Sequence, residues 1–392
     1  MRVLSLETRA LLVCSIAVFV DTLLYYMIVP LVPELAERIS LSQFQVGALF
    51  GSYALCLIGG TYVAGRMHFR TGQRVVMMTA IVALGVATLL FATSENFAIL
   101  LAARCVQGVA AAFTWVLGLA LVMTYYPEAK RGMALGIAVS VANAGYLLGP
   151  PVGGLLGERL GYSAPFILGV FLVVVDGLAR YFLLPETEAR KEEYDITWRS
   201  LLGDHSVKLL AYSSALVGAT YAMFDVALPL RLHEAFLASP QEIGLVFAAL
   251  AITFVVSSPP IGKLSDRFGY LRIVGVGYLL VALILVAPLF VSNLWQMGAV
   301  LVFVGLFSNF VFAPCQPGMA KVIDARGSAH YAVGVSLLSV SYSIGMMVGA
   351  YAGSLVVQHF GFEVAIAGTV ALYLAGAAWG LLLARSGIQR TL

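Results

Sequence analysis

The sequence predicts an all-α integral membrane protein with twelve transmembrane helices in two pseudo-symmetric six-helix bundles. Three observations lead to this fold class. The 392 residues are 61% hydrophobic and 11% charged, whereas soluble proteins carry roughly 25% charged residues. Apolar runs long enough to cross a bilayer recur along the whole chain. Segments of the second half also repeat segments of the first half at a nearly constant offset.

The apolar runs define the expected helices in order, because a helix needs about 20 apolar residues to cross the hydrocarbon core. The predicted spans are residues 9–33, 43–66, 74–93, 96–126, 130–157, 163–184, 207–232, 241–264, 271–291, 294–322, 329–358 and 362–385. A polar stretch between the sixth and seventh spans is rich in Glu, Arg and Lys. We therefore expect an N-terminal bundle at residues 1–186, a cytoplasmic linker at 187–206 and a C-terminal bundle at 207–392.

Basic residues predict the orientation of these spans. With the N-terminus in the cytoplasm, only Arg38, Arg159 and Arg231 of the 23 Lys and Arg residues fall outside, and Arg104 lies within a span. Such a bias follows the positive-inside rule, so both termini are expected to be cytoplasmic. The sequence contains no Asn-x-Ser/Thr glycosylation site, which fits a bacterial inner membrane.

Two pairs of segments relate the halves to each other. Gly65, Arg70 and Gly72 match Gly262, Arg267 and Gly269 at an offset of 197 residues. GYLLGPPVGG at 145–154 matches GMMVGAYAGS at 345–354 at an offset of 200. Parallel repeats of this kind are typical of two-bundle transporters, whose substrate site lies near the bilayer midplane.

The first span contains a single charge, Asp21, near its centre. A carboxylate at the bilayer midplane costs at least about 2.5–3.5 kcal/mol, and such residues usually line an ion or substrate pathway. No basic residue in the same run can neutralise it. We therefore interpret Asp21 as a substrate-binding acid rather than as a carboxylate neutralised by a neighbouring helix.

The seventh span has a counterpart in Asp225, and the two acids are expected to face one cavity from opposite halves. A carboxylate in a poorly hydrated cavity can bind and release protons near physiological pH, so Asp225 is expected to carry the coupled proton. Tyr25 follows Asp21 by one turn and Tyr221 precedes Asp225 by one turn. Their rings can attract a cationic amine through cation–π interactions.

Other polar residues within the spans allow two interpretations. Asp176 precedes Arg180 by four residues, the spacing of an intrahelical ion pair, and we favour that structural role. Arg104 is a buried cation that either holds neighbouring helices or takes part in proton coupling. Asn143 and Asn309 either bind substrate or bridge helices.

Three motifs resemble those of the major facilitator superfamily. GKLSDRFGYLR at 262–272 resembles its cytoplasmic-loop motif, in which Asp266 and Arg267 would form a charge latch. ARCVQGVAA at 103–111 resembles the R-x-x-Q-G motif of proton-coupled drug exporters. GYLLGPPVGG resembles the antiporter motif of drug:proton exchangers, with close helix contacts and a bend expected from six residues: Gly145, Gly149, Pro150, Pro151, Gly153 and Gly154.

Among these exchangers the chain most resembles the vesicular monoamine transporters, in FVDTLLYYMIVPLVPEL at 19–35 and AMFDVALPLRLHE at 222–234. The resemblance implies that Asp21 binds the amine, that Asp225 replaces a glutamate, and that Asp176 matches an aspartate of the sixth helix. The acids of the family's last two helices fall at Ser339 and near Tyr373, so the coupling residues differ.

The expected function is a monomeric proton-coupled antiporter that exports cationic monoamines by alternating access. The open alternative is a broad multidrug:proton exporter of lipophilic cations. No G-x-x-x-x-G-K-[ST] loop, HExxH motif or clustered cysteines occur, so the sequence predicts no enzyme activity, cofactor or metal. The expected partners are a cationic amine or drug, protons and the lipid bilayer, and not nucleic acid.

Overall fold

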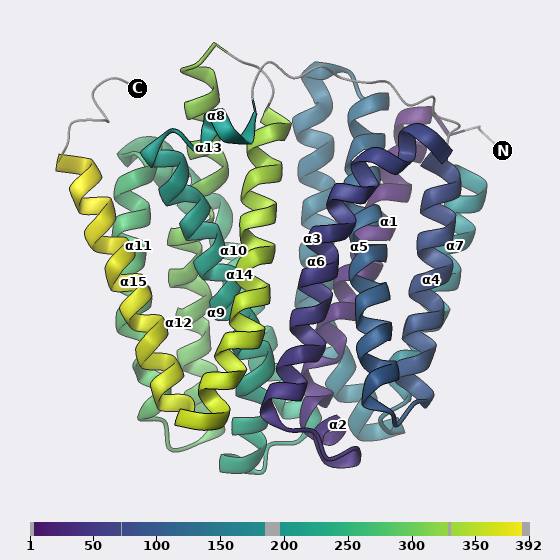
Figure 1. The fold of residues 1–392 in the computed structure, drawn as a ribbon, viewed down its shortest axis with the longest axis vertical. Coiled ribbons are helices and arrows are strands. Elements are labelled where there is room, and N and C mark those ends of the chain that lie inside the picture. Colours follow the sequence, from purple (N-terminus) through teal and green to yellow (C-terminus); the bar gives the residue numbers. More distant parts are fainter. Residues whose placement is uncertain (1–3, 72, 185–196, 328–330, 386–392) are drawn as a thin grey trace. The chain divides into compact units, whose positions relative to one another are not determined.

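The computed structural model describes residues 4–71, 73–184, 197–327 and 331–385, and these ranges contain helices and no strand (Figure 1). The helices are α1 (Leu6–Met27), η1 (Val29–Leu31), α2 (Val32–Arg38), α3 (Gln43–Thr71), α4 (Gln73–Thr93), α5 (Phe97–Tyr125), α6 (Glu128–Leu160), α7 (Ala164–Leu183), α8 (Trp198–Leu201), α9 (His205–Phe236), α10 (Pro240–Phe268), α11 (Tyr270–Ile284), η2 (Ala287–Leu289), α12 (Leu294–Phe312), α13 (Cys315–Asp324), α14 (Tyr331–Phe360) and α15 (Phe362–Arg385).

Twelve helical stretches of the described residues are long and apolar enough to cross a membrane, and each coincides with one predicted span. The all-α membrane fold is therefore confirmed. Proline accounts for the helix breaks within two of these spans. The first span changes from α1 to η1 and α2 around Pro30 and Pro33, and the tenth breaks between α12 and α13 at Pro314. Proline lacks the N–H that would continue an α-helix.

The chain divides into two compact units. Unit 1 comprises Met1–Lys191 and Leu237–Ala248, and unit 2 comprises Glu192–Phe236 and Ala249–Leu392. Helix α10 contributes its first turns to unit 1 and the remainder to unit 2. The predicted boundaries of the linker stay a prediction, because residues 185–196 lie outside the described residues.

The matching glycine-rich segments at 145–154 and 345–354 make the same kind of close helix contact, each within its own unit. In unit 1 a Cβ atom at Gly153 of α6 would collide with the carbonyl oxygen of Met27 on α1. In unit 2 a Cβ atom at Gly345 of α14 would collide with the carbonyl oxygen of Ala215 on α9. Small residues let helix backbones approach closely in membranes. Glycines therefore allow close packing of α6 on α1 in unit 1 and of α14 on α9 in unit 2.

Substitution of Gly153 by alanine is expected to lower stability, by about 1–3 kcal/mol, because the backbones of α1 and α6 must separate to admit the methyl group. Gly136 on the same helix has open space around its Cα, so Gly136→Ala should have no effect or stabilise the helix by up to about 1 kcal/mol. Thermal unfolding of the two variants in detergent provides the measurement. Equal midpoints for the two variants would contradict the close contact.

Candidate functional site

Asp21 lies near the middle of the first span and is buried in unit 1, with 4% of its surface exposed. The indole Nε1 of Trp115, on α5, donates a hydrogen bond of 3.0 Å to Asp21 Oδ2. Tyr53, on α3, also interacts with this carboxylate. Side chains from three helices therefore meet at the acid that the sequence singled out.

Aromatic rings surround the next turn of α1. The ring centroid of Tyr25 lies 4.8 Å from that of Tyr53 and 5.8 Å from that of Phe50. The ring of Tyr26 lies 4.4 Å from that of Tyr146 on α6. The combination of a buried carboxylate with π-faces is chemically suited to an organic cation.

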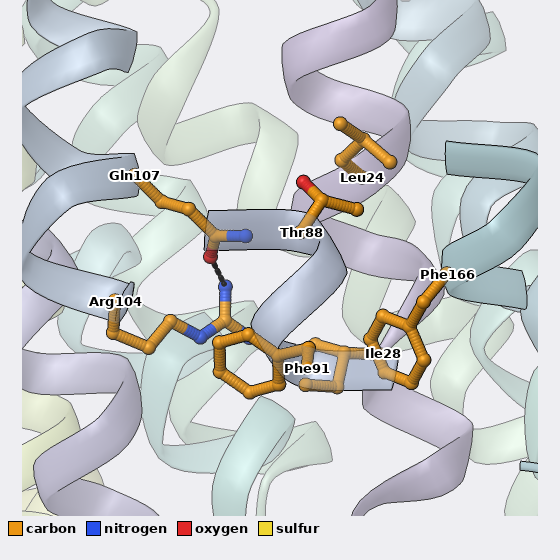
Figure 2. Close-up of a pocket in the computed structure, with 7 residues that line it drawn as sticks. All are labelled: Leu24, Ile28, Thr88, Phe91, Arg104, Gln107 and Phe166. Carbon is orange, nitrogen blue, oxygen red and sulfur yellow. Dashed lines mark hydrogen bonds between the residues drawn. The ribbon is translucent and has the colours of Figure 1, made fainter. Parts of the chain in front are cut away.

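Arg104, on α5, is also buried and lies against two rings of this aromatic group, Tyr25 and Phe50. Its Nη1 donates to Gln107 Oε1 at 3.2 Å, and its guanidinium lies 4.9 Å from the Phe50 ring, 5.0 Å from the Phe91 ring and 5.7 Å from the Tyr25 ring. Figure 2 shows Arg104 reaching toward Gln107 with Phe91 beside it. Tyr25, one turn after Asp21 on α1, thus contacts this cation.

A cavity of about 10 Å³ adjoins Arg104, which is roughly the volume that one water molecule occupies. The residues that line it come from α1, α4, α5, α7 and the turn after α1: Leu24, Ile28, Thr88, Phe91, Arg104, Gln107 and Phe166 (Figure 2). Such a volume excludes an amine. The cavity is therefore not the substrate site in this structure.

Tyr162 lies in the turn between α6 and α7, where its ring contacts Phe166 of the cavity lining, with centroids 5.1 Å apart. Burial raises the pKa of its hydroxyl above the ordinary value, although Arg38, 5.1 Å from the ring centroid, opposes the shift. The hydroxyl therefore stays protonated at neutral pH.

The ion pair expected within α7 is present and fully buried. Arg180 Nη2 lies 2.7 Å from Asp176 Oδ2, and both side chains have 0% exposure. Arg180 also donates to the carbonyl oxygen of Met77 at 3.1 Å and to Thr114 Oγ1 at 3.2 Å. This network links α7 to α4 and α5 next to the Asp21 site, as the electrostatic interaction between Arg180 and Asp21 indicates.

In unit 2, Asp225 and Tyr221 are both buried on α9, at 4% and 5% exposure. The Tyr221 ring lies 5.6 Å from the ring of Phe254 on α10. Asn309 Nδ2, on α12, donates to the Phe254 carbonyl oxygen at 2.7 Å and to Ser257 Oγ at 2.9 Å. Asn309 therefore bridges helices, which is one of the two roles left open by the sequence.

The other candidates predicted from the sequence are Asn143, Asp266 and Arg267. Asn143 is half-buried on α6. Asp266 forms an ion pair of 3.7 Å with Lys321 of α13, and both side chains are exposed. Arg267 lies over the ring of Phe268 at 5.2 Å. The first copy of this motif falls on residues 65–72, whose side chains lie outside the described part of the structure.

The antiporter-like segment of α6 also contacts the first turns of α10 within unit 1. A Cβ atom at Gly154 would collide with the carbonyl oxygen of Pro240, and one at Gly244 with that of Pro150. Glu158 Oε2 accepts a hydrogen bond of 3.0 Å from the backbone N–H of Gln241. Helix α6 continues through Pro150 and Pro151, so their missing N–H groups do not end it.

Sequence reasoning missed Trp115 and Tyr53. Trp115 lies eleven residues, or about three helical turns, after Arg104, so it occupies the same face of α5 as a residue that had been selected. That periodicity was the available signal. Tyr53 has no comparable signal in the sequence. Across the described ranges, no three His, Cys, Asp or Glu side chains come close enough together to hold a metal ion.

Curated proteins with related sequences are transporters. The chain is 28% identical to the synaptic vesicular amine transporter of Mus musculus over 81% of its own length, and it spans 62% of that relative. It is also 28% identical to the MFS-type transporter SLC18B1 of Homo sapiens, over 96% of this chain and 87% of that protein.

Solved structures show the same fold at lower sequence identity. A bacterial homologue of the human lysosomal transporter Spinster, in an inward-facing and occupied conformation, superimposes with a TM-score of 0.82 and 17% identity over 97% of both chains. The model of the Major Facilitator Superfamily matches residues 14–213 and 210–390. The chain therefore belongs to the Major Facilitator Superfamily, and its sequence is similar to those of vesicular amine transporters.

Proposed function

We propose that this protein exchanges protons for cationic amines across the membrane. The observation that carries the proposal is Asp21, a carboxylate buried in the first span whose partners are Trp115 and Tyr53 and whose neighbouring turn is enclosed by aromatic rings. The relatives named as amine transporters support it. The chain spans 62% of the first of these relatives, so a cationic amine is proposed as its substrate and is not assigned from the relative alone.

In the proposed cycle, the ammonium group of the substrate pairs with ionised Asp21. Asp225, buried in unit 2, carries the exchanged proton, and protonation favours one orientation of the transporter while amine binding favours the other. Alternating access then couples outward movement of the amine to inward movement of protons. We place both termini in the cytoplasm on the basis of the Lys and Arg distribution. The proposal also includes a bacterial inner membrane, which the absence of Asn-x-Ser/Thr sites fits, and a monomer.

Transport into proteoliposomes tests this function directly. We expect a labelled aromatic amine such as serotonin to accumulate in vesicles with an acidic lumen, and the accumulation to collapse when a protonophore removes the pH gradient. Asp225→Asn should retain amine binding but lose most of the gradient-driven accumulation. Full pH-driven uptake by this variant would reject Asp225 as the proton carrier, and no uptake of any amine by the native protein would reject the exchange.

The second candidate is a broad exporter of lipophilic cations. The group of Tyr25, Tyr26, Phe50, Tyr53 and Tyr146 favours it, because the π-faces of tilted and edge-on rings attract cations without selecting their substituents. A panel of biogenic amines, cationic dyes and cationic antibiotics separates the two candidates. Inhibition of labelled amine uptake by biogenic amines alone supports the amine exchanger. Equal inhibition by all three classes supports the broad exporter.

A further inference from the structure

Asp21 is held by neutral hydrogen-bond donors and not by a direct ion pair. Indole nitrogen can only donate, so the 3.0 Å contact from Trp115 Nε1 satisfies one lone pair of the carboxylate when it is ionised. Within the described residues, no Lys or Arg lies within 4.0 Å of Asp21, and Tyr53 is the second polar neighbour. The charge of the carboxylate therefore remains available for a cation that enters the site.

Packing fixes the indole in its position. Trp115 lies against a hydrophobic cluster that α1, α5 and α6 build together: Cys14, Val18, Val122, Ala134, Ala138 and Ala142. This packing restricts rotation of the indole, so its N–H is held in a position that can orient the carboxylate of Asp21.

Two charged groups that act on Asp21 come from α7. Arg180 and Asp176 form an ion pair with each other, and they act on Asp21 through space in opposite directions, with Arg180 the stronger of the two. Tyr53 on α3 is the remaining titratable neighbour. Among the groups that touch Asp21, the indole N–H is therefore the fixed donor that distinguishes its ionised from its protonated form.

We propose that Trp115 is a positioning residue that keeps Asp21 ionised and oriented, and thereby sets the pH range in which the transporter accepts a cationic amine. This inference rests on the proposed function. A proton and an ammonium group compete for the same carboxylate, and a hydrogen bond to the charged form favours the ammonium. Without the indole N–H, the proton competes better and amine binding requires a higher pH.

Trp115→Phe tests the proposal, because it keeps an aromatic ring and removes the N–H. We expect binding of a tritiated aromatic amine to the purified protein to weaken about tenfold at neutral pH, the expected loss of one hydrogen bond to a charged group. The binding curve should move up by about one pH unit, with the limiting affinity recovered at alkaline pH. A purely structural role would lower the amount of active protein and leave the pH midpoint unchanged.

Trp198→Phe is the matched control. Trp198 lies on the short helix α8 of unit 2 and donates its indole N–H to Ser336 Oγ at 3.0 Å, so this variant loses an indole hydrogen bond that does not involve Asp21. Its amine binding should keep the native pH midpoint. The same shift in both variants would overturn the proposal.

A second readout does not need the substrate. The infrared C=O band of protonated Asp21, identified by its absence in Asp21→Asn, can be followed against pH in native protein and in Trp115→Phe. A higher midpoint in the variant supports the positioning role even if the native protein binds no amine, in which case only the proposed function fails. Amine binding with an unchanged infrared midpoint would retain the function and reject the role of Trp115.

Discussion

Asp21→Asn is expected to abolish gradient-driven amine uptake. The substitution removes the negative charge while keeping the side-chain volume, and the substrate ammonium would then enter a buried site without a counter-charge. Removing one partner of a buried ion pair costs about 3–5 kcal/mol, which corresponds to at least a hundredfold loss of affinity. Uptake of labelled amine into vesicles with an acidic lumen measures the effect.

Two variants make this result interpretable. Glu95 is exposed in an ion pair with Arg38, so Glu95→Gln removes a carboxylate that does not contact Asp21 and should retain native uptake. Asp21→Glu keeps the charge with a longer reach and should retain measurable binding with altered affinity. Native uptake by correctly folded Asp21→Asn protein would place the amine elsewhere.

The sequence could predict which residues are buried, because the cost of a polar group in a membrane shows in its position along an apolar run. Asp21 and Asp225 were found in this way, and the structure buries both. The pair of Asp176 and Arg180 was also accessible, since a spacing of four residues fixes their separation on one helix. Likewise, the glycine-rich segments that match at an offset of 200 residues make equivalent helix contacts, α6 on α1 in unit 1 and α14 on α9 in unit 2.

Contacts between helices could not be predicted in the same way. The hydrogen bond from Trp115 to Asp21 depends on the rotation of α5 about its own axis relative to α1, and Tyr53 depends on the rotation of α3. A single sequence shows which residues share a face of one helix. It does not show how far that helix is rotated about its axis relative to its neighbours. Asn309 shows the same limit, because its helix-bridging contacts to Phe254 and Ser257 became evident only from the position of α10.

Arg180→Met is expected to destabilise the protein by about 3–5 kcal/mol, because it leaves the carboxylate of Asp176 buried without its cation. The carbonyl oxygen of Met77 and the hydroxyl of Thr114 also lose their donor from Arg180. Unfolding of the purified protein in detergent, by heat or denaturant, gives the measurement. The ion pair of Arg38 with Glu95 is exposed, so Arg38→Met should cost at most about 1 kcal/mol and serves as the control.

The double variant Asp176→Leu/Arg180→Met separates stability from function. Replacement of a buried ion pair by apolar side chains is often neutral, so the double variant should recover most of the stability that Arg180→Met loses. Arg180 and Asp176 act on Asp21 in opposite directions, so removing both charges changes the electrostatics at that carboxylate less than removing Arg180 alone. We therefore expect the double variant to bind amine with nearly native affinity. A stable double variant that has lost amine binding would show instead that the ion pair belongs to the transport site, and that its role extends beyond joining α7 to α4 and α5.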